Sequence, residues 1–174
     1  MGVVLIGGGA RSGKSLFALE YAARFERRGF VATAQALDEE MAERIRRHQA
    51  ERGPQWTTIE EPLDLAAAIE REQHKFGVLV VDCLTLWLSN VMSEPGRDPL
   101  HEIGRLRECL AVPRDTHVAL ITNEVGCGIV PENELARRYR DLAGEMNQVI
   151  ASVSSEVYWM VFGTPLTVKK DINS

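Results

Sequence analysis

The sequence is poor in cysteine, and its three cysteines are widely spaced. Cys83, Cys109 and Cys127 form no C-x-x-C pair, which argues against a zinc site and against a disulfide framework. The chain also lacks an apolar run near 18 residues and has no basic stretch followed by an apolar one at its start. We therefore expect no membrane span and no signal peptide. Together these absences favour a soluble protein of the reducing cytoplasm.

An excess of positive charge is missing as well. The 174 residues carry 20 Lys and Arg against 25 Asp and Glu, a formal net charge of −5. Bulk charge therefore does not favour nucleic acid, and a small molecule is the default partner. Internal repeats, low-complexity tracts and shifts in composition are absent, and 45% of the residues are hydrophobic. We expect residues 1–174 to form one globular domain with a sizeable core.

A phosphate-binding motif follows the first apolar run of the chain. Residues 3–6 are Val-Val-Leu-Ile, and residues 8–15 fit the pattern G-x-x-x-x-G-K-[ST]. Glycines let backbone N–H groups converge on phosphate oxygens, and a helix that begins near Gly13 directs its positive end at the same anion. Lys14 is expected to reach the β- and γ-phosphates, and the Ser15 hydroxyl to hold Mg²⁺. The motif predicts binding of a nucleoside triphosphate.

Strands and helices are predicted to alternate along the rest of the chain. Apolar runs predict further strands at residues 30–33, 56–60, 76–82, 117–122 and 157–162, with an extended segment at 163–170. Helical spacing predicts helices at 16–25, 38–52, 63–72, 85–92, 98–110 and from about 133 to 152. The run Arg27-Arg28-Gly29 is typical of a cationic last turn and stop for the first helix. The alternation predicts an α/β fold of the P-loop NTPase class (RecA-like), with a mostly parallel central sheet flanked by helices.

Two strand ends carry candidate site residues. Asp82 ends the apolar run at 76–82, where P-loop proteins place an acid associated with Mg²⁺. The loop Thr33-Ala34-Gln35 leaves another strand at the edge that carries the phosphate loop, a suitable place to touch the nucleotide. We therefore expect Ser15 and Asp82 to hold the metal between them.

A basic segment at 38–52 holds the most reactive candidate. Helical spacing places Arg44, His48 and Arg52 on one face. A neutral imidazole is a good nucleophile toward phosphorus, and neighbouring arginines neutralise the triphosphate and favour the unprotonated ring. Spacing alone leaves a second interpretation open, in which His48 is a solvated polar residue on a basic face. The other histidines, in charged or edge contexts, are predicted to be surface residues: His74, His101 and His117.

The phosphate loop by itself leaves three classes of protein open. They are a small-molecule kinase or nucleotidyltransferase, a motor or transporter ATPase, and a nucleotide-gated switch. The chain has neither an LSGGQ-like signature nor the N-K-x-D tetrapeptide that reads guanine in switch GTPases. A small transferase is therefore favoured, with a non-enzymatic switch as the weaker alternative.

Several sequence blocks together identify a family resemblance that covers nearly the whole chain. The blocks are residues 8–15, residues 38–45 running into His48, Trp56 to Glu60, residues 82–90, residues 122–133 and residues 140–148. They resemble the bifunctional adenosylcobinamide kinase/adenosylcobinamide-phosphate guanylyltransferases. The resemblance implies an enzyme of cobalamin biosynthesis that phosphorylates adenosylcobinamide with ATP or GTP. It then transfers GMP from GTP to that phosphate, which gives adenosylcobinamide-GDP and pyrophosphate.

The resemblance also implies roles for individual residues. It implies a GMP–histidine intermediate on His48, catalysis assisted by Lys14, Mg²⁺ as cofactor, and a homotrimer with the site near a subunit interface. Some members carry a second histidine before the nucleophile, where this chain has Arg47. A kinase-only phosphotransferase remains the alternative. The implied nucleotide contacts are Gly8, Gly9, Ala10, Arg11, Ser12, Gly13, Lys14, Ser15, Thr33, Ala34, Gln35, Gln49, Ala50, Glu51, Arg52, Glu60 and Asp82.

The residues that would hold the corrinoid are less well marked. Glu124, Glu132, Asn133 and Arg137 are candidates because they are polar and lie near a Gly-rich loop at 125–130. Helix capping and subunit contacts would explain the same residues equally well.

Overall fold

A seven-stranded sheet runs through the computed structural model of the protein, which describes residues 2–35, 39, 43, 46, 50 and 52–171. The strand order is β3-β2-β4-β5-β1-β6-β7, and every neighbouring pair is parallel except β6 and β7. The strands are β1 (Val3–Gly8), β2 (Arg28–Ala32), β3 (Trp56–Glu60), β4 (Val78–Asp82), β5 (His117–Ile121), β6 (Glu156–Val161) and β7 (Thr164–Lys170). The mostly parallel α/β sheet predicted from the sequence is confirmed.

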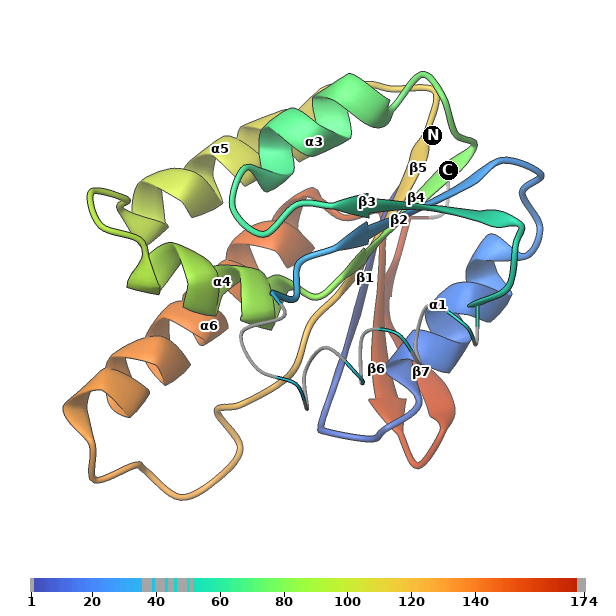
Figure 1. Ribbon diagram of the computed structural model, residues 1–174. Helices are drawn as coiled ribbons and strands as arrows, with labels where there is room; N and C mark the ends of the chain where they lie inside the picture. The colour runs from blue at the N-terminus through green and yellow to red at the C-terminus, as the bar shows by residue number, and fades with distance from the viewer. Residues whose placement is uncertain are drawn as a thin grey trace.

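Helices cover both faces of this sheet. The helices whose bounds are described are α1 (Lys14–Ala22), α3 (Leu65–Glu72), α4 (Leu84–Ser93), α5 (Pro99–Ala111) and α6 (Glu134–Val153). Figure 1 shows α1 on one side of the sheet and α3, α4, α5 and α6 on the opposite side. Because β1 to β6 run parallel to one another, these six strands all end at one edge of the sheet.

The apolar strands are buried because the side chains on their two faces pack into two separate hydrophobic cores. In β1, Val3 and Leu5 pack with α3, α4, α5 and α6, whereas Val4 and Ile6 pack with α1. The same alternation continues through β4 and β5. A continuous apolar run is therefore what a central parallel strand requires, because both of its faces are covered.

Two predicted helix starts are confirmed by their caps. The Asp98 carboxylate accepts a hydrogen bond from the backbone N–H of Leu100, and Pro99 is the first residue of α5. The Asn133 side-chain oxygen accepts from the N–H of Ala136 at the start of α6. Such caps satisfy N–H groups that the first helical turn leaves without partners.

The predicted end of the first helix is wrong. The helix ends at Ala22, and Arg28 and Gly29 already belong to β2. The Arg28 guanidinium nevertheless bonds to the carbonyls of Ala23 (2.7 Å) and Phe25 (2.6 Å), in the turn after α1. The cationic group therefore caps the turn from the following strand, a tertiary arrangement that helical spacing does not reveal.

The segment at 163–170 is more than an extended tail, because most of it forms β7, which pairs antiparallel with β6. Phe162 and Gly163 connect the two strands, and both have positive φ, at 50° and 80°. Two such residues in succession are the pattern of a tight type I′ hairpin turn. Figure 1 shows this hairpin reaching the edge where the parallel strands end, with both chain termini at the opposite edge.

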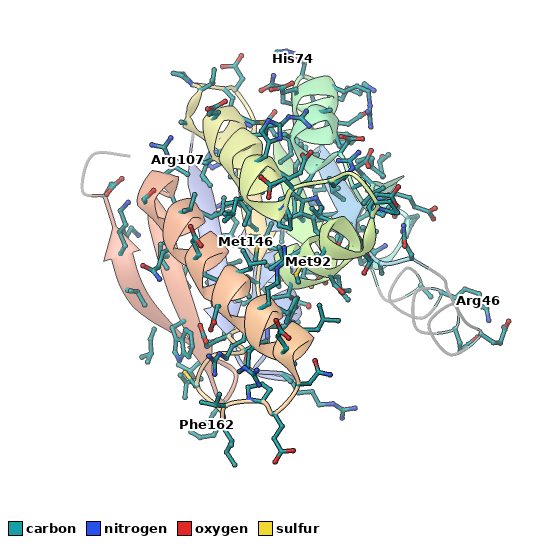
Figure 2. All side chains as sticks on the ribbon, turned by 90° about the vertical axis from the view of Figure 1, so that its left-hand side faces the viewer. Arg46, His74, Met92, Arg107, Met146 and Phe162 are labelled. Carbon is teal, nitrogen blue, oxygen red and sulfur yellow. The ribbon has the colours of Figure 1, made fainter. Side chains whose placement is uncertain are left out.

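The predicted helix at 38–52 lies largely outside the described residues. Asp38, Arg44, Arg47, His48, Gln49 and Glu51 are among those outside, so the structure says nothing of their placement. Of the described residues in this range, Arg46 forms exposed ion pairs with Glu39 (2.9 Å) and Glu43 (2.8 Å), and Figure 2 shows it projecting away from the sheet.

Candidate active site

The phosphate loop connects the end of β1 to the start of α1, as the sequence predicts. Gly8 has φ of 150°, and a Cβ added there would lie 2.7 Å from the carbonyl oxygen of Met160. Gly13 has φ of 96°, and a Cβ there would lie 3.0 Å from Cα of Gly163. Glycine is thus required at both positions, because of the backbone conformation and because the β6–β7 hairpin approaches so closely.

The hairpin supports the loop directly. The N–H of Gly163 donates to the carbonyl of Ser12 at 3.0 Å, and the N–H of Ser12 donates to the carbonyl of Gly9 at 3.3 Å. The side chain of Phe162 beside this bond is 99% exposed, and Figure 2 shows its label at the tip of the hairpin. The contact between hairpin and loop fixes the curvature of residues 9–12.

The Lys14 ammonium lies over the phosphate loop. Its Nζ donates to the carbonyls of Gly8 (3.1 Å) and Gly9 (2.5 Å) and lies 3.5 Å from Oγ of Ser12. Burial lowers the pKa of Lys14 from its ordinary value, while the nearby Cys83 and Asp82 oppose this shift. A buried cation held by loop carbonyls is well placed to exchange them for phosphate oxygens.

Ser15 and Asp82 meet at the same edge, as predicted. The Ser15 hydroxyl donates to Oδ2 of Asp82 at 3.2 Å, although 67 residues separate them. Mg²⁺ prefers oxygen ligands and takes few of them from the protein, completing its shell with phosphates and water. A hydroxyl and a carboxylate at this distance fit such a site. Among the described residues, no group of three or more His, Cys, Asp or Glu side chains is arranged to hold a metal.

Thr33 follows β2 and is fully buried. Its hydroxyl donates to the carbonyl of Cys83 and accepts from the N–H of Cys83, both at 2.8 Å. Its own N–H donates to the carbonyl of Asp82 at 3.2 Å, and its carbonyl accepts from Asn90 at 2.8 Å. Both donors of Thr33 are therefore engaged within the chain, where they brace the backbone beside Asp82.

A second polar network joins β5 to α4 and α6. The Asn123 side chain donates to the Thr85 hydroxyl at 3.0 Å, and the Tyr139 hydroxyl donates to the Thr85 carbonyl at 3.0 Å. Thr122 donates to the side-chain oxygen of Asn147 at 2.7 Å. Hydrogen bonds between side chains thus join the sequence block 122–133 to the blocks 82–90 and 140–148. They hold the strand-end edge together, since buried polar groups require partners.

Arg52 is a described residue of the basic segment and is 8% exposed. Its guanidinium lies 3.6 Å from the centre of the Phe30 ring, and Nη2 donates to the Thr58 hydroxyl at 3.2 Å. Burial lowers its pKa from the ordinary value, and the negative charge of Asp82 opposes this. The contacts of Arg52 come from Phe30 in β2 and Thr58 in β3. Spacing along the basic segment does not reveal them.

The remaining predicted nucleotide contacts fall into two groups. Ala34 and Gln35 lie half-buried just after β2, Glu60 is exposed at the end of β3, and Ala50 is exposed. Gly9, Ala10 and Arg11 are exposed on the phosphate loop, and Arg11 has φ of 56°. The other group, which includes the predicted nucleophile, lies outside the described residues: His48, Gln49 and Glu51.

The proposed corrinoid residues have contacts within their own segment. Asn133 caps α6, and the Arg137 guanidinium bonds to the carbonyls of Pro131 (3.0 Å) and Glu132 (2.6 Å). Glu124 accepts from the N–H of Gly126. Helix capping, one of the two interpretations that the sequence left open, is what the structure shows for Asn133.

The other histidines are placed away from this edge. His74 and His101 are exposed as predicted, and Figure 2 shows His74 at the end of the molecule opposite Phe162. The prediction for His117 is wrong, because this residue is half-buried at the start of β5, with its ring centre 4.8 Å from that of Phe25. Burial lowers the pKa of His117 from its ordinary value.

Two residues of the polar network have partners that the sequence does not reveal. Thr85 and Asn147 lie within the blocks 82–90 and 140–148 that carry the family resemblance, but their hydrogen-bond partners, Asn123 and Thr122, lie on another element and do not follow from spacing. The Phe162-Gly163 turn did have a signal, a short Gly-containing break between two apolar alternating stretches. No helix among the described residues is long and apolar enough to cross a membrane.

Comparison with known proteins agrees with the fold and the site. The chain resembles the RadB recombinase (TM-score 0.50, 14% identity, 91% of this chain and 73% of that one). It also resembles an ATPase of a bacterial type III secretion system (TM-score 0.58, 11% identity, 91% of this chain and 50% of that one). At such identities the likeness concerns the fold alone, and it confirms the predicted P-loop NTPase class.

Sequence relatives are much closer. The chain is 46% identical over 169 residues to the bifunctional adenosylcobalamin biosynthesis protein CobP of Pseudomonas aeruginosa, covering 95% of this chain and 96% of the relative. It is 36% identical over 182 residues to CobU of Escherichia coli, which carries the same description, covering 96% and 99%. The family model described as cobinamide kinase / cobinamide phosphate guanyltransferase matches residues 4–168. The chain therefore belongs to the cobinamide kinase / cobinamide phosphate guanyltransferase family.

Proposed function

We propose that this protein is a bifunctional adenosylcobinamide kinase and adenosylcobinamide-phosphate guanylyltransferase, acting as one domain over residues 1–174. Family membership supports the pair of activities. The observation that carries the kinase half is the meeting of Ser15 and Asp82 at 3.2 Å beside the Lys14 ammonium. Lys14 supplies positive charge for phosphoryl transfer, and the Ser15 hydroxyl and Asp82 carboxylate are oxygen ligands that would hold Mg²⁺.

In the first step the hydroxyl of adenosylcobinamide attacks the γ-phosphorus of ATP or GTP. Lys14 and the backbone of residues 8–15 bind the phosphates, and Ser15 and Asp82 would hold Mg²⁺, which would supply further positive charge to the triphosphate. Loss of the charge on Lys14 would remove stabilisation of the transferring group. Ala34, Gln35 and Glu60, which lie at or just past the ends of β2 and β3, complete the proposed nucleotide contacts, and the buried Thr33 acts on the nucleotide through the backbone that it braces.

In the second step GMP passes through His48. The imidazole attacks the α-phosphorus of GTP and releases pyrophosphate, and the phosphate of adenosylcobinamide phosphate then displaces the histidine. The buried Arg52 supports this proposal, because a buried cation favours an anion nearby. We include Gln49, Ala50, Glu51 and Arg52 among the nucleotide contacts. We also propose a homotrimer and action in the cytoplasm, where both triphosphates are present.

Covalent labelling with α-labelled GTP tests the transferase half. The proposal expects one acid-labile, base-stable label per chain, lost in His48→Ala. His74→Ala is the matched control, because His74 is exposed at the opposite end of the molecule (Figure 2) and its loss should leave labelling unchanged. Absence of label in the wild type, with phosphorylation of adenosylcobinamide retained, would indicate the kinase-only alternative. Tight GTP binding without turnover of either step would indicate a nucleotide-gated switch.

A further inference from the structure

The kinase step requires an acceptor for a proton, because the attacking hydroxyl loses one as the new phosphorus–oxygen bond forms. In protein kinases a carboxylate near the γ-phosphate takes this role. In this fold such a group must lie at the edge where the parallel strands end, close to the phosphate loop. The need for such a group rests on the proposed function.

Four carboxylates end a parallel strand, or follow one within three positions, in the part of the chain that the structure describes. They are Glu60, Glu61, Asp82 and Glu124. Asp82 accepts from Ser15 and is the proposed metal ligand. Glu61 accepts from the N–H groups of Leu63 (3.2 Å) and Asp64 (2.8 Å) before α3, so its role is structural.

The position of each strand decides between the remaining two. Glu60 ends β3, which is separated from β1 by β2, β4 and β5. Strands are spaced about 4.8 Å apart, so β3 lies about 19 Å from the strand that carries the phosphate loop. Glu124 follows β5, the immediate neighbour of β1 on one side and of β4, which ends in Asp82, on the other.

Hydrogen bonds attach Glu124 to the phosphate loop. Its N–H donates to the carbonyl of Gly8 at 3.0 Å, and the same carbonyl accepts from Nζ of Lys14 at 3.1 Å. One carbonyl group therefore joins the backbone of Glu124 to the ammonium that is expected to contact the γ-phosphate. The side chain is half-buried, so it remains accessible to a substrate.

The carboxylate is also held in one orientation. Its Oε1 accepts from the N–H of Gly126, and a Cβ added to Gly126 would lie 2.7 Å from that oxygen. Glycine at 126 thus leaves space for the carboxylate to fold back over the loop. A carboxylate that is held in one orientation, on a residue whose backbone is bonded to the phosphate loop, is suited to proton transfer.

We propose that Glu124 is the general base of the kinase step. The substrate O–H bond breaks as its oxygen bonds to the γ-phosphorus, and the proton passes to the Glu124 carboxylate. The bond between the γ-phosphorus and the β,γ-bridging oxygen breaks, and the nucleoside diphosphate leaves with that electron pair. The guanylyl step needs no such base, because its nucleophiles are an imidazole and an ionised phosphate.

The test separates the two steps in Glu124→Gln. The kinase kcat with adenosylcobinamide should fall about 10²- to 10⁴-fold, the usual contribution of a general base. Guanylyl transfer to adenosylcobinamide phosphate supplied ready-made should stay within about threefold of wild type, which also reports that the variant folds. Glu134→Gln, an exposed carboxylate at the start of α6, is the matched control and should retain both rates.

Gly126→Ala keeps the carboxylate but pushes it from its position, so it should lower the kinase kcat while sparing the guanylyl step. A rise in the corrinoid KM of both steps in Glu124→Gln would overturn the proposal and assign Glu124 to substrate binding. An unchanged kinase kcat would overturn it as well. Failure of the wild type in both steps would instead refute the proposed function.

Discussion

The bonds between Thr33 and Cys83 predict a large effect from a small change. Thr33→Val replaces a hydroxyl by a methyl group of similar size, and both partners of that hydroxyl are backbone groups of Cys83, which is 4% exposed. The change leaves the buried N–H of Cys83 without its partner, whereas the carbonyl of Cys83 keeps a hydrogen bond from the N–H of Trp87 at 3.1 Å.

The magnitude follows from the two lost bonds. Leaving the Cys83 N–H without a partner costs about 1–3 kcal/mol, and the lost bond to the carbonyl, which keeps its second donor, costs about 0.5–1.5 kcal/mol, so Thr33→Val should lower the free energy of unfolding by about 2–4 kcal/mol. Thr33→Ser is the matched control, because it keeps the hydroxyl and loses one methyl group, at about 1 kcal/mol. Asp82 is bonded to Cys83 in the chain, so we also expect Thr33→Val to need more Mg²⁺ for half-maximal kinase activity.

Urea unfolding of nucleotide-free protein measures the stability term, and an unchanged m-value shows that the extent of unfolding is the same in both variants. The reasoning is refuted if the free energies of unfolding of Thr33→Val and Thr33→Ser differ by less than about 0.5 kcal/mol. Such a difference is smaller than the cost of leaving one buried polar group without a partner. A normal Mg²⁺ requirement in Thr33→Val would separately show that the brace does not position Asp82.

Three further predictions concern other parts of the chain. Lys14→Met should reduce the kcat of both steps by at least about 10²-fold, since it removes transition-state charge stabilisation. Loss of less than about tenfold in either step would contradict this role. Burial lowers the pKa of His117 below 6.5, so the unfolded chain binds the proton more readily and the free energy of unfolding falls as the pH drops below 6.5. In His117→Gln, the free energy of unfolding measured in urea should depend less on pH in that range. The same pH dependence in the variant and the wild type would refute this. Phe162→Asn should raise the thermal midpoint by about 2–4 °C, because Asn adopts positive φ with about 1 kcal/mol less strain than Phe. A lower midpoint, measured by calorimetry, would contradict this and show that the Phe162 ring has stabilising contacts.

The agreement between sequence and structure is best where a pattern has a local cause. The phosphate loop requires glycines and a following helix, and the buried strands require continuous apolar runs, so both were predictable from neighbouring residues alone. The caps of α5 and α6 belong to the same class, because an Asp or Asn at such a boundary acts on the next three residues.

Predictions failed where the partner is distant in sequence. Local pattern places Arg28 in the last turn of the first helix, whereas its role as a cap depends on the return of the chain into β2. Local pattern likewise places His117 on the surface, whereas Phe25, whose ring contacts it, lies 92 positions earlier. Spacing within one element carries no information about such contacts.

The sequence by itself determined the class of fold, the triphosphate cradle and the family, because each depends on an ordered set of residues along the chain. Only the tertiary structure decided how the strand ends are ordered across the sheet. That order brings Ser15 to Asp82, directs the Thr33 hydroxyl inward to Cys83, and places Glu124 rather than Glu60 beside the phosphate loop. The physical reason is that parallel strands share one edge, and hydrogen bonding across the sheet, not position in the chain, sets which strands are neighbours.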